Sequence, residues 1–322
     1  MKFLIIRFSS IGDIVLATPL VRCLKKKFPE SRIDFVLKER YAGVLSGNPG
    51  ISNLILYGGG IVPLIKKIRS EKYDYVLDIH GNFLSSLVSL FSGAKVLRSR
   101  RYLFERFMLV EFGLNFYRRN IPVSDRYIET ASRLGVADDG LGPEFFVAGG
   151  VKNSLGVPPG IYAGICPVSV WKTKRWPQEN FAELSKKIVA EKGCGVLIFG
   201  GPGDRDYCEK IRESAGGRAY NLSGLSIQET AFYLRMCRVA VTNDTGPMHI
   251  ACALKIPVVA IFGPTVEEFG FYPQAAGSKV VSKGLPCKPC STKGCAECPA
   301  GGFGCMKDIS IEEVFSNCAG YL

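Results

Sequence analysis

The first group able to do acid–base chemistry is an aspartate near the start of the chain. The segment Ser9–Asp13 reads Ser-Ser-Ile-Gly-Asp and separates an apolar run at residues 2–8 from an amphipathic run. The carboxylate of Asp13 could act as a general base toward a substrate hydroxyl group, with Ser10 and the permissive backbone of Gly12 beside it. An aspartate at this point is also typical of a helix cap or of a first-turn acid that matches the helix dipole. The spacing leaves both interpretations open.

A second polar segment has the pattern of an anion site. Val241–His249 reads Val-Thr-Asn-Asp-Thr-Gly-Pro-Met-His, and its proline suits the first turn of a helix. Free backbone amides at Thr245 and Gly246, with the threonine hydroxyl, would bind a diphosphate. Asp244 could bond a sugar hydroxyl or order the loop. His249 lies four residues after Thr245 and hence on the same helix face, although a lone histidine is more often structural.

A third segment, Ser169–Pro177, supplies positive charge after another apolar run. It contains Lys172, Lys174 and Arg175. A cation fixed beside a strand end can neutralise a phosphate leaving group without a metal ion. Three cations within nine residues are more commonly a solvated basic loop.

Two further observations bear on the chemistry. The turn Asp78–Asn82 follows an apolar run, and Asp78 could meet a substrate from the first half of the chain. No GxxxxGK[ST] or GxGxxG pattern occurs, so neither a P-loop nor standard dinucleotide binding has support.

Five of the twelve cysteines gather near the end of the chain. Cys287 and Cys290 form one pair, Cys295 and Cys298 a second, and Cys305 follows. The pairing is that of metal ligands, but the four residues between the pairs are fewer than zinc knuckles usually have. A structural zinc site, disulfides and free thiols stay open. The segments suited to catalysis lie elsewhere, so the cluster would have a structural role in each case.

The elements that must position these segments follow the rhythm of a parallel sheet. Short apolar runs alternate with amphipathic runs, as in α/β folds with helices on both sheet faces. Strands are predicted at 2–8, 32–37, 51–57, 73–79, 162–166, 195–199, 238–242 and 257–262. Helices are predicted at 14–28, 63–71, 83–91, 102–116, 177–191, 205–215, 227–236 and 247–254.

A break rich in glycine and proline divides the chain into two domains. It lies at 148–159, so we expect domains at 1–150 and 151–322. Both have the pattern of Rossmann-like domains, which we expect to face each other across a central cleft. Ligands of such sheets bind beyond the carboxyl ends of the strands, and the polar segments described above fall at those ends.

Composition and charge exclude several classes of protein. The 322 residues include 41 Lys and Arg against 29 Asp and Glu, a net charge of +12. No apolar run approaches the roughly 18 residues of a transmembrane helix. Arg7 and Asp13 interrupt the apolar start, no signal-peptide cleavage site follows, and we expect a cytoplasmic protein. The basic residues are dispersed and no nucleic-acid-binding motif occurs, so we expect no nucleic-acid partner.

One segment mixes basic and aromatic residues. Arg98–Arg119 could meet an anionic lipid surface or an acidic acceptor. A helix packed in the core with a solvated basic face would have the same pattern.

Four motifs, in order along nearly the whole chain, resemble glycosyltransferase family 9, the ADP-heptose:lipopolysaccharide heptosyltransferases. They are Phe8–Pro19, Lys174–Pro177, Asn243–His249 with Phe262–Thr265, and Pro286–Cys290 to Cys305–Ile309. The resemblance implies a GT-B fold and a glycosyltransferase that transfers with inversion and without a metal ion. It further implies that residues 1–150 bind the acceptor and that residues 151–322, with a Cys-rich loop and a terminal helix, bind the ADP-sugar.

The resemblance also implies roles for individual residues. Asp13 matches the catalytic base, and Lys174 matches the lysine that steadies the diphosphate. The matched donor-binding residues are Ser169, Asp244, Thr245, Gly246 and His249. Toward the acceptor we expect weaker contributions from Ser10, Gly12 and Asp78.

The expected reaction moves a heptose from ADP-heptose to the inner core of lipopolysaccharide. The acceptor would be the lipid A–core glycolipid, reached by peripheral contact with the cytoplasmic face of the inner membrane. An alternative within the family is another nucleotide sugar or another glycan acceptor. A nucleic-acid-binding protein and a metal- or redox-sensing scaffold built on the cysteines are alternatives from other classes.

Overall fold

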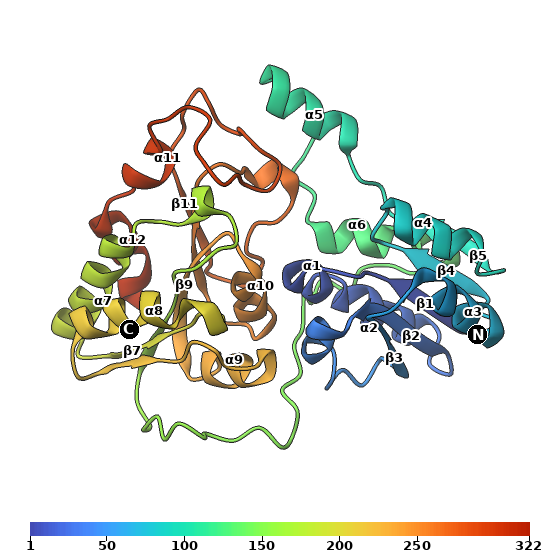
Figure 1. Ribbon diagram of the computed structural model, residues 1–322, viewed down its shortest axis with the longest axis horizontal. Helices are drawn as coiled ribbons and strands as arrows, with labels where there is room; N and C mark the ends of the chain where they lie inside the picture. Colours follow the sequence, from blue (N-terminus) through green and yellow to red (C-terminus); the bar gives the residue numbers. More distant parts are fainter. The chain divides into compact units, whose positions relative to one another are not determined.

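Two compact units make up the chain, and the computed structural model describes all of residues 1–322. The first unit comprises Met1–Tyr102 and Ile121–Ala148, and the second comprises Leu103–Asn120 and Gly149–Leu322. Each unit is built on one parallel sheet with helices on both of its faces (Figure 1). The predicted α/β class is therefore confirmed.

The units divide the chain differently from the predicted domains at one segment. The expected boundary after residue 150 left Leu103–Asn120 in the first domain, whereas the structure assigns this segment to the second unit and ends the first unit at Ala148. The guanidinium of Arg106 lies 5.8 Å from the ring centres of both Phe269 and Phe271. These partners are remote in sequence, so no local pattern reveals the contact.

The sheet of the first unit has the strand order β3-β2-β1-β4-β5. Its strands are β1 (Lys2–Ile6), β2 (Arg32–Lys38), β3 (Asn53–Tyr57), β4 (Tyr75–Asp78) and β5 (Lys95–Arg98). Its helices are α1 (Ile11–Val15), α2 (Thr18–Lys27), α3 (Ile61–Glu71), α4 (Phe83–Leu90) and α6 (Val123–Glu129). Helices α3 and α4 cover the face that carries Leu4 and Ile6, and α2 packs with α6. The central strand β1 is buried, so whatever follows it is held on a rigid element.

The helix predicted at 14–28 is in fact two helices, α1 and α2. Pro19 lies in the first turn of α2 and has no amide hydrogen to continue the ladder from α1. The hydroxyl of Thr18 instead donates to the carbonyl of Val15 at 2.7 Å. The break makes α1 a separate turn of helix that presents Asp13 directly after β1.

The sheet of the second unit has the strand order β11-β10-β9-β6-β7-β8. Its strands are β6 (Tyr162–Cys166), β7 (Gly195–Ile198), β8 (Ala219–Asn221), β9 (Cys237–Asn243), β10 (Val258–Phe262) and β11 (Lys279–Ser282). Its helices are α5 (Leu103–Phe112), α7 (Gln178–Lys192), α8 (Arg205–Ala215), α9 (Ile227–Leu234), α10 (Gly246–Ala253), α11 (Gly304–Lys307) and α12 (Ile311–Cys318). Helices α7, α8 and α12 share one core with the sheet, centred on Trp176 and Phe181.

Three strands were absent from the predicted set, namely β5, β8 and β11. All three lie at sheet edges, and each has only three or four residues, several of them partly exposed. An edge strand is covered on fewer sides than a central strand, so it needs no long apolar run. Helix α6 was also absent from the predicted set, because its seven residues are too few to show a helical repeat of apolar positions.

Candidate active site

The candidate residues follow the two strands at which the chain order of each sheet reverses. In the first unit this switch point lies between β1 and β4, and in the second unit between β6 and β9. Asp13 follows β1, and Asp78 ends β4; Lys174 follows β6, and Asp244 follows β9. Open parallel sheets bind ligands beyond the carboxyl ends of such strands. Each unit thus presents its polar residues where its own topology provides a crevice.

The Asp13 carboxylate is held by four hydrogen-bonding or charged contacts, and its side chain is only 13% exposed. Arg7 Nη2 lies 2.5 Å from Oδ1, and the hydroxyl of Tyr127 donates to the same oxygen at 3.3 Å. The backbone amide and the hydroxyl of Ser10 donate to Oδ2 at 3.1 and 2.8 Å. The helix-cap interpretation is therefore confirmed, because Asp13 ties the start of α1 through Ser10, while the role of its carboxylate as a general base stays a prediction.

These contacts decide the charge of Asp13. Burial alone raises the pKa of this carboxyl, but the charge and hydrogen bond of Arg7 and the bonds from Ser10 outweigh burial and lower the pKa to about 2. The Arg7 guanidinium is itself fixed by donating to the carbonyl of Ile79 at 2.9 Å. The carboxylate is therefore anionic at every pH at which the protein is expected to work.

The carboxylate of Asp78 makes its hydrogen bonds within the turn that follows β4, and its contact with an acceptor stays a prediction. Asp78 is buried, and its carboxylate accepts from the amides of His80 and Gly81 at 3.1 and 2.9 Å and from Ser85 Oγ at 3.1 Å. Through these bonds Asp78 fixes the shape of the turn. Gly12 is buried in α1, and the hydroxyl of Ser10 is used by Asp13.

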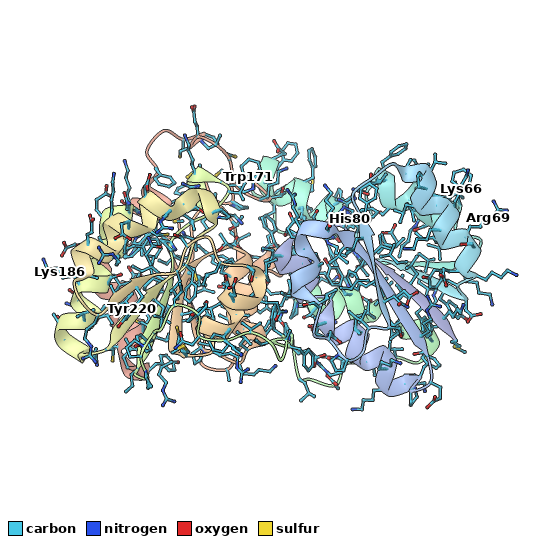
Figure 2. The ribbon with its side chains drawn as sticks, turned by 60° about the horizontal axis from the view of Figure 1, so that its bottom comes forward. Lys66, Arg69, His80, Trp171, Lys186 and Tyr220 are labelled. Carbon is cyan, nitrogen blue, oxygen red and sulfur yellow. The ribbon has the colours of Figure 1, made fainter.

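The same turn carries His80, labelled in Figure 2, which is close enough to Arg7 and Asp13 to interact with their charges. Its ring meets the ring of Phe8 edge-on at 5.3 Å, and its Nδ1 is buried with no hydrogen-bond partner. Burial first, and then the positive charge of Arg7, lower the pKa of His80 to about 4. His80 is therefore neutral at neutral pH.

In the second unit, a buried ion pair joins the ends of β6 and β9. Lys174 Nζ lies 2.5 Å from Oδ2 of Asp244 and 3.4 Å from the Asp244 carbonyl. The hydroxyl of Thr265, from the segment after β10, donates to the same carboxylate oxygen at 2.7 Å. All three residues are less than 10% exposed. The sequence did not single out Thr265 for a role, because its partner Asp244 is identified only by the fold.

A helix start adjoins this pair. Thr245 is the N-cap of α10, and its side chain makes no capping bond. Pro247 has no amide hydrogen and the amide of Met248 donates to the Thr245 carbonyl at 3.2 Å, so the amides of Thr245 and Gly246 are the ones that could bind a ligand at this end. The amide side chain of Asn243 bonds the carbonyl of Pro167 at 2.8 Å and the amide of Trp176 at 3.1 Å, which holds the two strand ends together. A helix start beside a cation suits an anionic group such as a phosphate.

Ser169 and His249, the other two residues expected to bind a donor, are both buried in the second unit. Ser169 is buried, and its hydroxyl accepts from the amide of Trp171 at 3.3 Å. His249 is buried within α10, and its ring lies 6.2 Å from that of Phe271. Trp171, labelled in Figure 2, opens the short 3-10 turn Lys172–Lys174.

The Cys-rich loop packs directly on that turn. The Thr173 hydroxyl donates to the carbonyl of Cys295 at 2.9 Å and accepts from its amide at 2.8 Å. Gly294 has a φ of +101°, and a Cβ atom there would stand 2.7 Å from Cβ of Trp171. The loop therefore supports the segment that carries Lys174, a function that the cysteine spacing did not indicate.

The cysteines of this loop do not form a ready ligand set. The one group of three potential ligand atoms within 4.8 Å of one another is Cys23, Asp138 and Asp139, far from the loop in sequence. A tetrahedral zinc thiolate site needs sulfur atoms about 3.8 Å apart. Zinc at Cys287, Cys290, Cys295 and Cys298 stays a prediction.

Comparison with known proteins agrees with this description. Residues 61–300 match the family model described as glycosyltransferase family 9 (heptosyltransferase). Lipopolysaccharide heptosyltransferase 2 of Salmonella typhimurium is 27% identical over 296 residues, 84% of each chain. Lipopolysaccharide heptosyltransferase 1 of Pseudomonas aeruginosa is 26% identical over 342 residues, 97% of this chain and 92% of the relative.

A solved structure shows the same architecture. The ADP-heptose lps heptosyltransferase II of Escherichia coli aligns with a TM-score of 0.77 and 25% identity, over 100% of this chain and 98% of that one. The fold and the site thus define a glycosyltransferase of the GT-B class. The chain belongs to glycosyltransferase family 9, the heptosyltransferase family.

Proposed function

We propose that this enzyme transfers a heptose from ADP-heptose to the inner core of lipopolysaccharide. The single observation that carries the proposal is the buried Lys174–Asp244 pair beside the start of α10, at the switch point of the second sheet. Relatives named as lipopolysaccharide heptosyltransferases, and one named for ADP-heptose, support this choice of donor and acceptor.

The donor would be bound by the second unit. The backbone amides of Thr245 and Gly246, at the start of α10, would hold the diphosphate, and Lys174 would balance its charge. Asp244, kept in place by Thr265, would accept a hydrogen bond from a sugar hydroxyl. Ser169 and His249 would complete the walls of this site.

Transfer would proceed by a single displacement with inversion. The acceptor hydroxyl oxygen forms a bond to the anomeric carbon, the bond from that carbon to the phosphate oxygen breaks, and ADP leaves with the electron pair. The proton of the hydroxyl goes to Asp13. A carboxylate with a pKa near 2 is a weak base, so it takes the proton late, when the new bond has made the hydroxyl strongly acidic.

The proposed reaction needs no divalent ion. A fixed cation and preorganised backbone amides can stabilise the charge that develops on a diphosphate leaving group. Lys174 and the start of α10 are such groups. Zinc in the Cys-rich loop, should it bind there, would be structural and has no part in the steps above.

The acceptor would be the lipid A–core glycolipid, and the enzyme would work as a peripheral protein at the cytoplasmic face of the inner membrane. The excess of 41 basic over 29 acidic residues suits a phosphorylated acceptor and an anionic surface. Within the family, another nucleotide sugar or another glycan acceptor is the competing assignment.

The test is incubation of the enzyme with ADP-heptose and a panel of truncated core acceptors, with and without EDTA. We expect one acceptor to gain the mass of one heptose at the same rate in EDTA, with the anomeric configuration inverted. Calorimetry should show binding of ADP-heptose and none of UDP-sugars. Transfer from a UDP-sugar would show that the enzyme uses another nucleotide sugar as its donor. Loss of activity in EDTA would overturn the metal-independent mechanism.

A further inference from the structure

Helix α5 and the segment after it expose an unusual amount of apolar surface. Six large apolar side chains within fourteen residues are each 50–62% exposed, and we call them the α5 surface. They are Leu103, Phe104, Phe107, Phe112, Leu114 and Phe116. Soluble proteins commonly expose single apolar residues, whereas a contiguous group of this kind marks a surface that meets a partner or a membrane.

The α5 surface is held in place by the opposite side of the segment. Leu109 is buried, and the Arg106 guanidinium lies over the rings of Phe269 and Phe271. Asn115 Nδ2 donates to Glu268 Oε1 at 3.3 Å, and the hydroxyl of Tyr272 donates to the carbonyl of Asn120 at 3.1 Å. The segment is therefore docked through one side while its aromatic rings face solvent.

The exposed rings also contact each other. Phe104 and Phe116 have ring centres 5.5 Å apart, and Phe107 and Phe112 are 5.7 Å apart. Four of the six exposed apolar side chains thus lie against one another in two pairs, so the exposed rings are grouped and not scattered singly.

Charge indicates what this surface meets. Between Arg98 and Arg119 the chain has six arginines and two glutamates, and Arg118 and Arg119 are exposed immediately after the α5 surface. A second copy of this chain would bring the same positive charge and a net charge of +12. A lipid bilayer with anionic headgroups offers the complementary charge together with an apolar layer for the rings.

We propose that the α5 surface inserts into the headgroup region of an anionic bilayer, with Arg118 and Arg119 on lipid phosphates. None of the helices is both long enough and apolar enough to cross a bilayer, so α5 would lie in the interface. Aromatic side chains are well suited to this position. The inference extends the peripheral membrane contact of the proposed function, but its test does not depend on the transfer reaction.

The test is sedimentation of the full-length protein with vesicles at physiological ionic strength. Vesicles of phosphatidylethanolamine and phosphatidylglycerol should bind the protein, and vesicles of phosphatidylcholine should bind it far less. The double variant Phe104→Gln/Phe107→Gln should bind the anionic vesicles at least ~10-fold more weakly, because two rings no longer enter the interface. Arg118→Gln and Arg119→Gln should each weaken binding roughly 5-fold.

A matched control changes two exposed apolar residues elsewhere. Leu141 and Leu155 are 60% and 51% exposed, and Leu141→Gln/Leu155→Gln should bind anionic vesicles as the unchanged protein does. Thermal unfolding followed by circular dichroism should show that all variants remain folded. Transfer to a water-soluble truncated acceptor should be unchanged in the phenylalanine variant, which separates this proposal from the proposed function.

Three outcomes would overturn the inference. The unchanged protein would fail to sediment with anionic vesicles, or the phenylalanine and control variants would bind alike. Alternatively, size-exclusion chromatography would show a dimer that the phenylalanine variant dissociates, which would make the α5 surface a contact between two copies.

Discussion

Arg7 Nη2 and Asp13 Oδ1 lie 2.5 Å apart at the carboxyl end of the central strand of the first sheet. Both side chains are largely buried, and the guanidinium is fixed a second time by the carbonyl of Ile79. The arginine therefore sets both the direction and the ionisation of the carboxylate that we propose as the base. The first three predictions test this relationship.

Asp13→Asn should abolish transfer while ADP still binds. The amide keeps the size of the carboxylate but cannot accept the proton, so turnover should fall about 10²–10⁴-fold, the usual contribution of a general base. The measurement is kcat with ADP-heptose together with the Kd of ADP by calorimetry. Near-normal turnover in this variant would remove Asp13 from its proposed role.

Arg7→Met should bring an acidic limb into the pH profile of kcat/KM. The pKa of Asp13 is about 2 in the folded protein, below its ordinary 3.8. Without the arginine, only the bonds from Ser10 still oppose the effect of burial, so the pKa of Asp13 should rise. The activity of Arg7→Met should then fall at an acidic pH at which the activity of the unchanged protein does not yet change. Arg7→Lys, which keeps the charge, should move the limb less. Identical profiles for all three proteins would contradict the assignment.

The same pair has a consequence for stability. A carboxyl with a lowered pKa stabilises the fold fully above its unfolded pKa near 3.8 and loses that contribution as the pH falls toward 2. Urea unfolding between pH 3 and pH 7 should therefore show a decline toward acid that is smaller in Asp13→Asn. An equal decline in both proteins would mean that other carboxyl groups carry the effect.

Lys174→Ala should weaken binding of ADP and lower turnover. The cation that balances the diphosphate is lost, and Asp244 remains nearby as an unpaired negative charge. Calorimetry with ADP measures the effect at a temperature where circular dichroism shows the variant folded. Lys172→Ala is the matched control, because Lys172 is exposed two residues away and should leave ADP affinity unchanged. Equal affinities in both variants would exclude Lys174 as a diphosphate ligand.

Thr265→Val should affect the sugar more than the nucleotide. Valine keeps the shape of threonine but removes the hydroxyl that donates to Asp244 at 2.7 Å. A hydrogen bond to a charged group contributes about 1.5–3 kcal/mol, so KM for ADP-heptose should rise while the inhibition constant of ADP stays constant. Thr265→Ser should restore the KM. A parallel loss for ADP would show that Thr265 supports the whole loop instead of Asp244 alone.

Gly294→Ala should destabilise the segment that carries Lys174. Its φ of +101° disfavours alanine, and the added Cβ would lie 2.7 Å from Trp171 Cβ. We expect a loss of about 1–3 kcal/mol in the free energy of unfolding and weaker ADP binding. Gly284→Ala is the control, because a Cβ there meets nothing within 4 Å. Unchanged ADP affinity in Gly294→Ala would show that the Cys-rich loop does not position Lys174.

The sequence by itself determined the α/β class, the family and the segments that carry the candidate chemistry. Apolar runs long enough for central strands identified β1, β6 and β9, and Asp13, Lys174 and Asp244 are recognisable because they follow such runs directly. These are local patterns, set by side chains within a few residues of each other.

Only the tertiary structure decided which residues act on one another. Arg7 meets Asp13 because the short connection from β1 to α1 turns the helix back over the end of the strand. Lys174 meets Asp244 because β6 and β9 are neighbours, and the Asp78 carboxylate bonds within its own loop. It also assigned α5 to the second unit and showed its rings exposed, where the sequence allowed either a core helix or a surface. Contacts between residues remote in sequence depend on strand order and side-chain direction, and a linear pattern specifies neither.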